Sequence, residues 1–213
     1  MTPELNFTIA GVDAPSFAAS PQLVFALNVT AETSQKIHTV ILRCQIMLET
    51  ARRRYSTGEQ HRLADLFGEP GRWGQTLRSM LWTNTSVVVP PFTGSIVVDL
   101  PVPCTFDFNV AATKYFAGID TGEVPVSVFF NGTVFYEAPE GNLQAGHISW
   151  EKESSYRLPI RLWREMMDAY YPNCTWLCLR RDAFTKLYEY KVQRGLPTFD
   201  DALLAALSIE KAS

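Results

Sequence analysis

Histidines, cysteines and a run of arginines are the side chains of this 213-residue chain that could carry out catalysis or bind ions. A hydrolytic triad needs a nucleophile, a histidine base and an orienting group brought together in space. The three histidines are His38, His61 and His147, and none lies in a nucleophile-elbow or cysteine-protease motif. We expect ordinary surface or structural roles for them and assign no catalytic residue.

The four cysteines could bind a metal, because thiolates are good zinc ligands. Cys174 and Cys178 form a C-x3-C pair, and Cys44 and Cys104 lie far from them in the sequence. A single C-x3-C without a second pair is a weak zinc signal, so buried thiols are the favoured interpretation. Cys174 and Cys178 stay candidate metal ligands, and a metal-handling protein stays an alternative function.

Three adjacent arginines, Arg52, Arg53 and Arg54, are the candidate anion-binding residues. Such a run is more often the solvated end of a strand or loop. The chain carries 19 Lys and Arg against 22 Asp and Glu, a formal net charge of −3, with no long block of either sign. This balance argues against nucleic acid or an anionic membrane as a partner. Phosphate-binding glycine motifs are absent from the sequence, and no cofactor is predicted.

Aromatic and methionine side chains offer a different chemistry, the recognition of another protein. Two groups are candidates: Trp73, Met80 and Trp82 in the first, and Trp163, Met166, Met167, Tyr170 and Tyr171 in the second. The same residue types are common in hydrophobic cores. A protein partner is expected, and a homo-oligomer is left open.

The elements that must position these residues indicate an α+β fold, built mainly from antiparallel β-sheet as a sandwich or curved sheet, with helices concentrated at the C-terminal end. We expect one domain over residues 1–213, with a β-rich body over 1–152 and a helical part over 153–213 packed on it. Hydrophobic residues make up 46% of the chain and aromatic residues 12%, which is enough for a well-packed core.

Alternation of apolar and polar residues predicts the strands. The clearest runs from Val40 to Leu48. Asn131-Gly132 suits a two-residue type I′ turn and predicts a hairpin. Asn84 and Asn131 each precede a threonine or serine by two residues, which predicts that they lie on the polar side of a strand. The other strands are expected at 5–10, 23–30, 77–89, 95–100, 106–116, 124–130, 133–137 and 143–150.

Helical spacing appears in four places. A short helix is expected over 58–67, ended by Gly68. Another follows Pro159 and ends near Tyr171. Two more occupy the C-terminal end, the last beginning at a capping sequence, Thr198-Phe-Asp-Asp201.

The N-terminal sequence has no basic segment followed by an apolar one, and no apolar run approaches the roughly 18 residues that span a bilayer. We therefore expect a soluble cytoplasmic protein without a membrane partner.

Two resemblances add to these expectations. The stretches Trp176–Lys191 and Arg194–Leu203, with the opening through Ile46, resemble a bacterial domain-of-unknown-function family. That resemblance implies an accessory gene product sometimes encoded near nickel-iron uptake hydrogenases, and it supplies no functional residues. The order of Phe7-Thr-Ile, Pro21-Gln-Leu-Val-Phe and His38-Thr-Val-Ile-Leu is similar to SecB-type chaperones, although the long helical end departs from that pattern.

Taken together, the residues favour a non-enzymatic binding, assembly or accessory factor. An enzyme or small-ligand-binding protein, with a site assembled from distant strands, is the other alternative beside metal handling.

Overall fold

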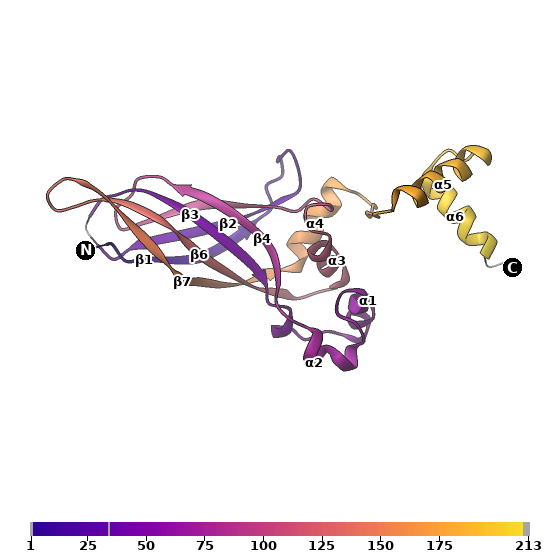
Figure 1. The fold of residues 1–213 in the computed structure, drawn as a ribbon, viewed down its shortest axis with the longest axis horizontal. Helices are drawn as coiled ribbons and strands as arrows, with labels where there is room; N and C mark the ends of the chain where they lie inside the picture. Colours follow the sequence, from indigo (N-terminus) through magenta and orange to yellow (C-terminus); the bar gives the residue numbers. More distant parts are fainter. Residues whose placement is uncertain (1, 34, 211–213) are drawn as a thin grey trace. The chain divides into compact units, whose positions relative to one another are not determined.

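The computed structural model describes residues 2–33 and 35–210. Its chain divides into two compact units, Met1–Cys174 and Thr175–Ser213, and each is described by itself. The described residues form two antiparallel sheets and six α-helices (Figure 1). This confirms the expected α+β class with mainly antiparallel sheet, whereas the single domain stays a prediction.

The first unit is a sandwich of two antiparallel sheets. The three-stranded sheet has the order β1-β2-β5, with β1 at Leu5–Asp13, β2 at Gln22–Ala31 and β5 at Ser95–Pro103. The four-stranded sheet has the order β4-β3-β6-β7, with β4 at Met80–Val89, β3 at Ile37–Leu48, β6 at Glu123–Glu137 and β7 at Leu143–Pro159.

The core lies between the two sheets. Alternate residues of β3, from Val40 to Leu48, are buried, as their alternation predicts. Phe7 of β1 stacks on Phe130 of β6, with ring centroids 4.8 Å apart. Phe25 of β2 meets Trp82 of β4 edge-on at 6.1 Å. These contacts join side chains from both sheets, so the sheets pack face to face.

Helices cover one end of the sandwich (Figure 1). They are η1 at Thr50–Arg52, α1 at Thr57–Phe67, η2 at Pro70–Arg72, α2 at Trp73–Thr76, α3 at Val110–Gly118 and α4 at Ile160–Tyr170. Trp163 of α4 stacks on Phe116 of α3 at 5.2 Å, and Phe116 meets Trp82 at 5.0 Å. This chain of aromatic rings joins the helical cap to the sandwich core.

Helix α1 confirms the predicted helix over 58–67. Ser56 and Glu59 form a capping box, in which each side chain accepts a hydrogen bond from the other residue's backbone N–H. Gly68 ends the helix with φ 75°, a conformation that glycine adopts at low cost. Helix α4 begins after Pro159, as expected.

The strand predicted at 106–116 is wrong, because α3 begins within it. Asn109 caps this helix, and its side-chain oxygen accepts from the Ala112 N–H at 3.0 Å. The buried side chains Ala112, Tyr115 and Phe116 recur at helical spacing. The aromatic and small residues of this run follow the helical period and not the alternation of a strand.

The predicted hairpin at Asn131-Gly132 is also wrong, because β6 continues through both residues. Gly132 pairs with Leu42 of β3 on one edge and with Ile148 of β7 on the other. The chain reverses after Glu137 instead, where the Ala138 N–H donates to the Asn142 carbonyl at 2.8 Å. Pairing along both edges of a long strand outweighs the local turn preference of Asn-Gly.

The second unit is a helical hairpin. Helix α5 spans Arg181–Gln193 and α6 spans Phe199–Glu210. Thr198 and Asp201 exchange hydrogen bonds, which confirms the predicted capping start. Phe184 contacts Phe199 with ring centroids 5.4 Å apart. No helix in the described part of the chain is long and apolar enough to cross a membrane.

Gly132 provides a test of the continuous β6 strand. A Cβ at this position would lie 2.1 Å from the Ile41 carbonyl oxygen of β3. Because overpacking costs about 1–3 kcal/mol, Gly132→Ala should lower the free energy of unfolding by about that amount. Denaturant unfolding followed by the fluorescence of the buried tryptophans measures it.

Gly71→Ala is the matched control, because a Cβ at Gly71 would meet no atom within 4 Å. We expect the control to change the free energy of unfolding by less than about 0.5 kcal/mol. Equal effects of the two substitutions would contradict the close β3–β6 approach.

Candidate functional site

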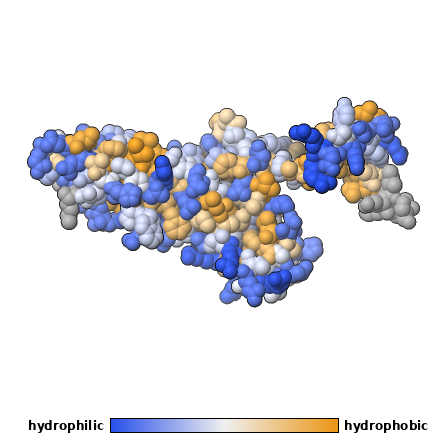
Figure 2. All heavy atoms as spheres, in the orientation of Figure 1, coloured by the Kyte–Doolittle hydropathy of each residue, from blue (hydrophilic) through white to orange (hydrophobic). Residues whose placement is uncertain are grey.

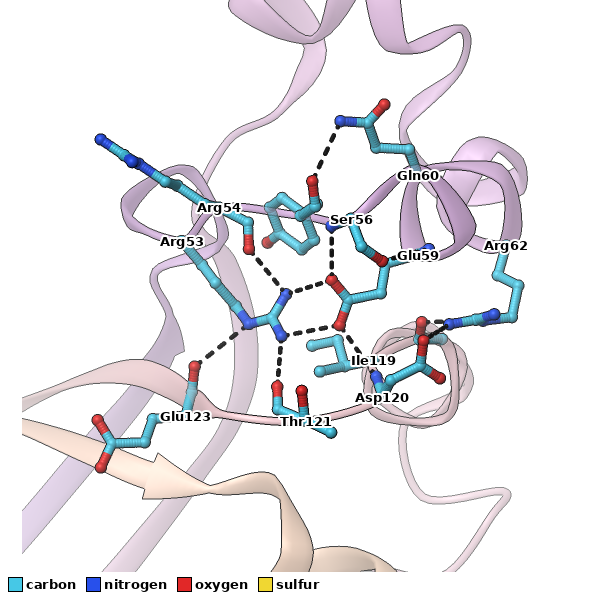
Figure 3. A network of polar contacts seen from close by, with 12 residues as sticks. Arg53, Arg54, Ser56, Glu59, Gln60, Arg62, Ile119, Asp120, Thr121 and Glu123 are labelled. Carbon is cyan, nitrogen blue, oxygen red and sulfur yellow. Dashed lines mark hydrogen bonds and ion pairs between the residues drawn. The ribbon is translucent and has the colours of Figure 1, made fainter.

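Arg53, the middle residue of the arginine run, forms an ion pair with Glu59 inside the first unit (Figure 3). Its guanidinium donates to both carboxylate oxygens of Glu59, at 3.1 and 2.8 Å. It also donates to the backbone carbonyls of Thr121 at 2.6 Å, Arg54 at 3.1 Å and Glu123 at 3.3 Å. The side chains of Arg53 and Glu59 are 10% and 5% exposed. The structure therefore corrects the expectation that Arg53 binds an external anion.

Glu59 is equally saturated. Its carboxylate accepts from the backbone N–H groups of Ser56 and Asp120, both at 2.9 Å. Burial raises the pKa of this carboxyl, but the hydrogen bonds from Arg53 and the two backbone N–H groups outweigh it and lower the pKa to about 2. The pair ties the first turn of α1 to the segment that enters β6 (Figure 3).

Two tyrosines adjoin this ion pair. The hydroxyls of Tyr55 and Tyr115 lie 2.9 Å apart, and the Arg53 guanidinium sits 5.0 Å from the centre of the Tyr55 ring. Burial raises the pKa of Tyr55 above its ordinary value, and burial does the same to Tyr115. Both phenols therefore keep their protons at neutral pH, and their hydroxyls hydrogen-bond to each other inside the cluster.

The other two arginines of the run differ from Arg53. Arg52 lies 3.8 Å from the Glu49 carboxylate and lines a cavity of about 310 Å³ with Arg157 and Ser127. Arg54 has an exposed side chain. Anion binding at Arg52 and Arg54 stays a prediction.

The predicted aromatic and methionine anchors lie mainly in the core. Five of them are at most 8% exposed: Trp73, Trp82, Trp163, Met166 and Met167. The remaining three are half-buried against the core: Met80, Tyr170 and Tyr171. The Trp73 ring N–H donates to the Gly68 carbonyl at 2.8 Å. Their burial corrects the expectation of two surface patches, since these side chains are already used in packing.

The cysteines divide into two kinds. Cys44 and Cys104 are buried, and burial raises the pKa of each thiol to about 12. Cys174 and Cys178 are exposed, so the buried-thiol interpretation fails for this pair. Within residues 2–33 and 35–210, no group of three or more His, Cys, Asp or Glu side chains is placed to hold a metal ion.

The surface that sequence reasoning missed belongs to the C-terminal unit. None of the residues of α5 is buried, and Ala202 is the buried residue among the described side chains of α6. The exposed large hydrophobic side chains of this unit are Trp176, Leu177, Leu179, Phe184, Tyr188, Val192, Phe199, Leu204 and Leu207. Figure 2 shows orange residues over α5 and α6, between strongly hydrophilic ones.

The exposed residues of α5 form one stripe. Phe184, Tyr188 and Val192 follow each other at intervals of four, so they lie on one face of the helix and are 47%, 52% and 59% exposed. Arg181 precedes Phe184 by three residues and shares this face. We call these four residues the α5 stripe. The spacing of four between Phe184, Tyr188 and Val192 was the available signal in the sequence.

Helix α5 and the residues at its ends carry more basic than acidic side chains. The basic residues in and around this helix are Arg180, Arg181, Lys186, Lys191 and Arg194, against the acidic residues Asp182 and Glu189. Arg180 pairs with Asp182 at 3.1 Å. Helix α5 therefore carries a net positive charge beside its apolar side chains, whereas α6, which contacts it through Phe199, has Asp200 and Asp201 in its first turn.

Comparison with known proteins identifies a family. The model of a family of unknown function, DUF6084, matches residues 2–213. A comparison with curated protein sequences gives no match.

Solved structures show distant similarity only. The CARDB domain of a Pyrococcus furiosus protein, solved with di-metal ions, is 9% identical; the match covers 74% of this chain and 92% of that one, with a TM-score of 0.28. A putative late embryogenesis abundant protein is 16% identical over 74% and 72% of the two chains, with a TM-score of 0.33. β-Glucosidase 3B from Thermotoga neapolitana is 11% identical over 73% and 17%, with a TM-score of 0.26. Similarity at these TM-scores carries no argument about function.

The Arg53–Glu59 pair predicts a pH-dependent stability. Because the pKa of Glu59 lies near 2 in the folded chain and near its ordinary 4.5 in the unfolded one, the pair stabilises fully above about pH 4.5. This contribution is lost as the pH falls toward 2. Glu59→Gln leaves a buried guanidinium without its carboxylate and should cost about 3–5 kcal/mol at neutral pH. The cost should shrink on acidification, as measured by denaturant unfolding across pH.

Asp65→Asn is the control on the same helix, since Asp65 forms an exposed pair with Lys114. An exposed pair contributes little, about 0–1 kcal/mol. If Glu59→Gln proved no more costly than Asp65→Asn, or its cost stayed constant down to pH 2, the pair would not hold α1 as described.

Proposed function

The chain belongs to this family of unknown function, DUF6084, and we propose that it is a non-enzymatic binding or accessory factor whose C-terminal unit recognises a protein partner. The single observation that carries the proposal is the exposure of the α5 stripe in a unit that lacks a core of its own.

Size explains why the hairpin needs a partner surface. Units below roughly 40 residues rarely bury enough apolar surface to be stable without disulfides, metals or association. The structure describes no disulfide within the hairpin, and Cys178 is a free thiol there. Full burial of an exposed apolar side chain is worth roughly 1.5–3 kcal/mol, and about half of that remains to be gained at Phe184 and Val192, which are 47% and 59% exposed. Covering the α5 stripe would therefore provide much of the free energy that binding requires.

Charge selects the kind of partner. An amphipathic helix that lays its apolar side chains on Phe184, Tyr188 and Val192 would place its flanking residues near Arg181, which shares that face of α5, and near Lys191, which borders it. Carboxylates at those flanks would be attracted and ammonium groups repelled. We therefore propose an amphipathic helix with acidic flanks, from another protein, as the occupant.

A second part of the proposal concerns biological setting. The resemblance of Trp176–Lys191 and Arg194–Leu203 to a family sometimes encoded near nickel-iron uptake hydrogenases supports a role as an accessory factor of that enzyme system. Both stretches fall in the C-terminal unit, which is the part assigned here to recognition. The partner helix would then belong to a hydrogenase subunit or to a protein of its assembly.

A defined peptide tests the recognition surface. We expect the full chain to bind a roughly 20-residue amphipathic helix with glutamate flanks, and to bind the same peptide with lysine flanks about tenfold more weakly, a difference of about 1.4 kcal/mol. Tyr188→Glu should abolish binding, because it places a carboxylate in the α5 stripe. Isothermal titration calorimetry and circular dichroism measure binding and helix content.

Phe17→Ser is the matched control, because Phe17 is a fully exposed phenylalanine of the first unit. It should leave peptide binding unchanged. Equal binding of the two peptides would overturn the charge argument. Dimerisation of the chain that Tyr188→Glu removes, seen by sedimentation, would show that a second copy occupies the stripe and would contradict the proposed partner.

The hydrogenase setting makes a separate prediction. Tagged full-length chain, purified from its own host while the hydrogenase is expressed, should retain a structural or assembly component of that enzyme. The Tyr188→Glu variant should lose it. Identification by mass spectrometry of reproducible partners without any hydrogenase component would overturn this part of the proposal and leave the peptide result standing.

A further inference from the structure

The outer face of the four-stranded sheet carries a cluster of polar side chains from three neighbouring strands. Arg43 of β3 lies in register with Ser86 of β4 and with Asn131 of β6. Two residues further along β3, on the same face, Gln45 lies in register with Asn84 of β4. These five residues line a groove of about 440 Å³, which we call the Arg43 groove.

The side chains of the Arg43 groove are exposed and unused by the fold. Within the parts of the chain that the structure describes, none of the five makes a side-chain hydrogen bond, and Arg43 is within ion-pair distance of no carboxylate. The contrast with Arg53 is direct, because every N–H-bearing atom of that guanidinium donates inside the protein. A groove of free donors and acceptors around one uncompensated cation is suited to a polar anion.

The composition of the groove narrows the ligand further. A guanidinium binds a carboxylate through two parallel hydrogen bonds. Side-chain amides such as those of Gln45, Asn84 and Asn131 both donate and accept, which matches hydroxyl groups that do the same. From these contacts we infer that the Arg43 groove binds a sugar acid, with its carboxylate on Arg43 and its hydroxyls on the amides.

Other ligands fit the groove less well. Nucleic acid needs several basic residues along a track, whereas the groove contains a single arginine. A simple carboxylate would leave the amide groups bound only to water, and a neutral sugar would leave the guanidinium bound only to water, so neither would use all the polar groups of the groove. The site lies in the first unit, away in sequence from the α5 stripe, so its test is independent of the proposed function.

Binding of D-glucuronate and D-galacturonate to the full chain tests the inference. Acetate and D-glucose serve as probes that carry only the carboxylate or only the hydroxyls. We expect at least one uronate to bind roughly tenfold or more tightly than either probe, because each probe lacks half of the contacts. Amide chemical shifts in NMR titrations should move for residues of β3, β4 and β6 around the groove.

Arg43→Gln should weaken uronate binding roughly tenfold or more, because it removes the charge-assisted bonds and keeps a polar side chain. Arg72→Gln is the matched control at an exposed arginine and should leave affinity unchanged. Failure of both uronates to bind at millimolar concentration would overturn the inference. So would equal binding of acetate, or binding that Arg43→Gln leaves intact. Unchanged denaturant unfolding of Arg43→Gln would show that any loss arises at the groove.

Discussion

Burial of apolar surface is the constraint on which the rest of this structure depends. In the first unit two sheets face each other and a helical cap closes one end, so aromatic and aliphatic side chains from distant strands share one core. Trp82, Phe116 and Trp163 join the cap to that core ring against ring. In the C-terminal hairpin the residues of α5 are not buried, because two short helices cannot enclose their own apolar faces. We therefore propose that the C-terminal unit binds the surface of another protein.

The polar side chains of the first unit also fall into two kinds, those buried in the fold and those exposed on its surface. The Arg53–Glu59 pair is buried, saturated with hydrogen bonds and tied to backbone on both sides, so it fixes α1 against the start of β6 and has no capacity left for a ligand. The Arg43 groove has the opposite character, with exposed donors and acceptors that no described part of the fold uses. Two arginines ten residues apart in sequence therefore serve structure in one case and carry a proposed ligand site in the other.

Much of the fold followed from periodicity, and the failures have physical causes. The alternation of β3, the end of α1 at Gly68, the cap of α6 and the start of α4 behind Pro159 are local signals that the structure confirms. The hairpin predicted at Asn131-Gly132 is wrong because the pairing of this segment with β3 and β7 cannot be seen in a short stretch of sequence. Trp163 and its neighbours lie in the core, and the sequence did not show this because the same residue types serve as binding anchors and as core residues. The polar side of β4 and β6 was predicted through Asn84 and Asn131, but their convergence on Arg43 needed the strand register.

The central claim is that α5 and α6 form the surface that a protein partner covers. Hydrogen–deuterium exchange of the full chain, with and without the glutamate-flanked amphipathic peptide, tests it most directly, because it reports where backbone amides gain protection. The account predicts slower exchange in Arg181–Gln193 and Phe199–Glu210 and unchanged exchange along the strands of the sandwich. Protection that appears on the strands, with the two helices exchanging as before, would contradict it.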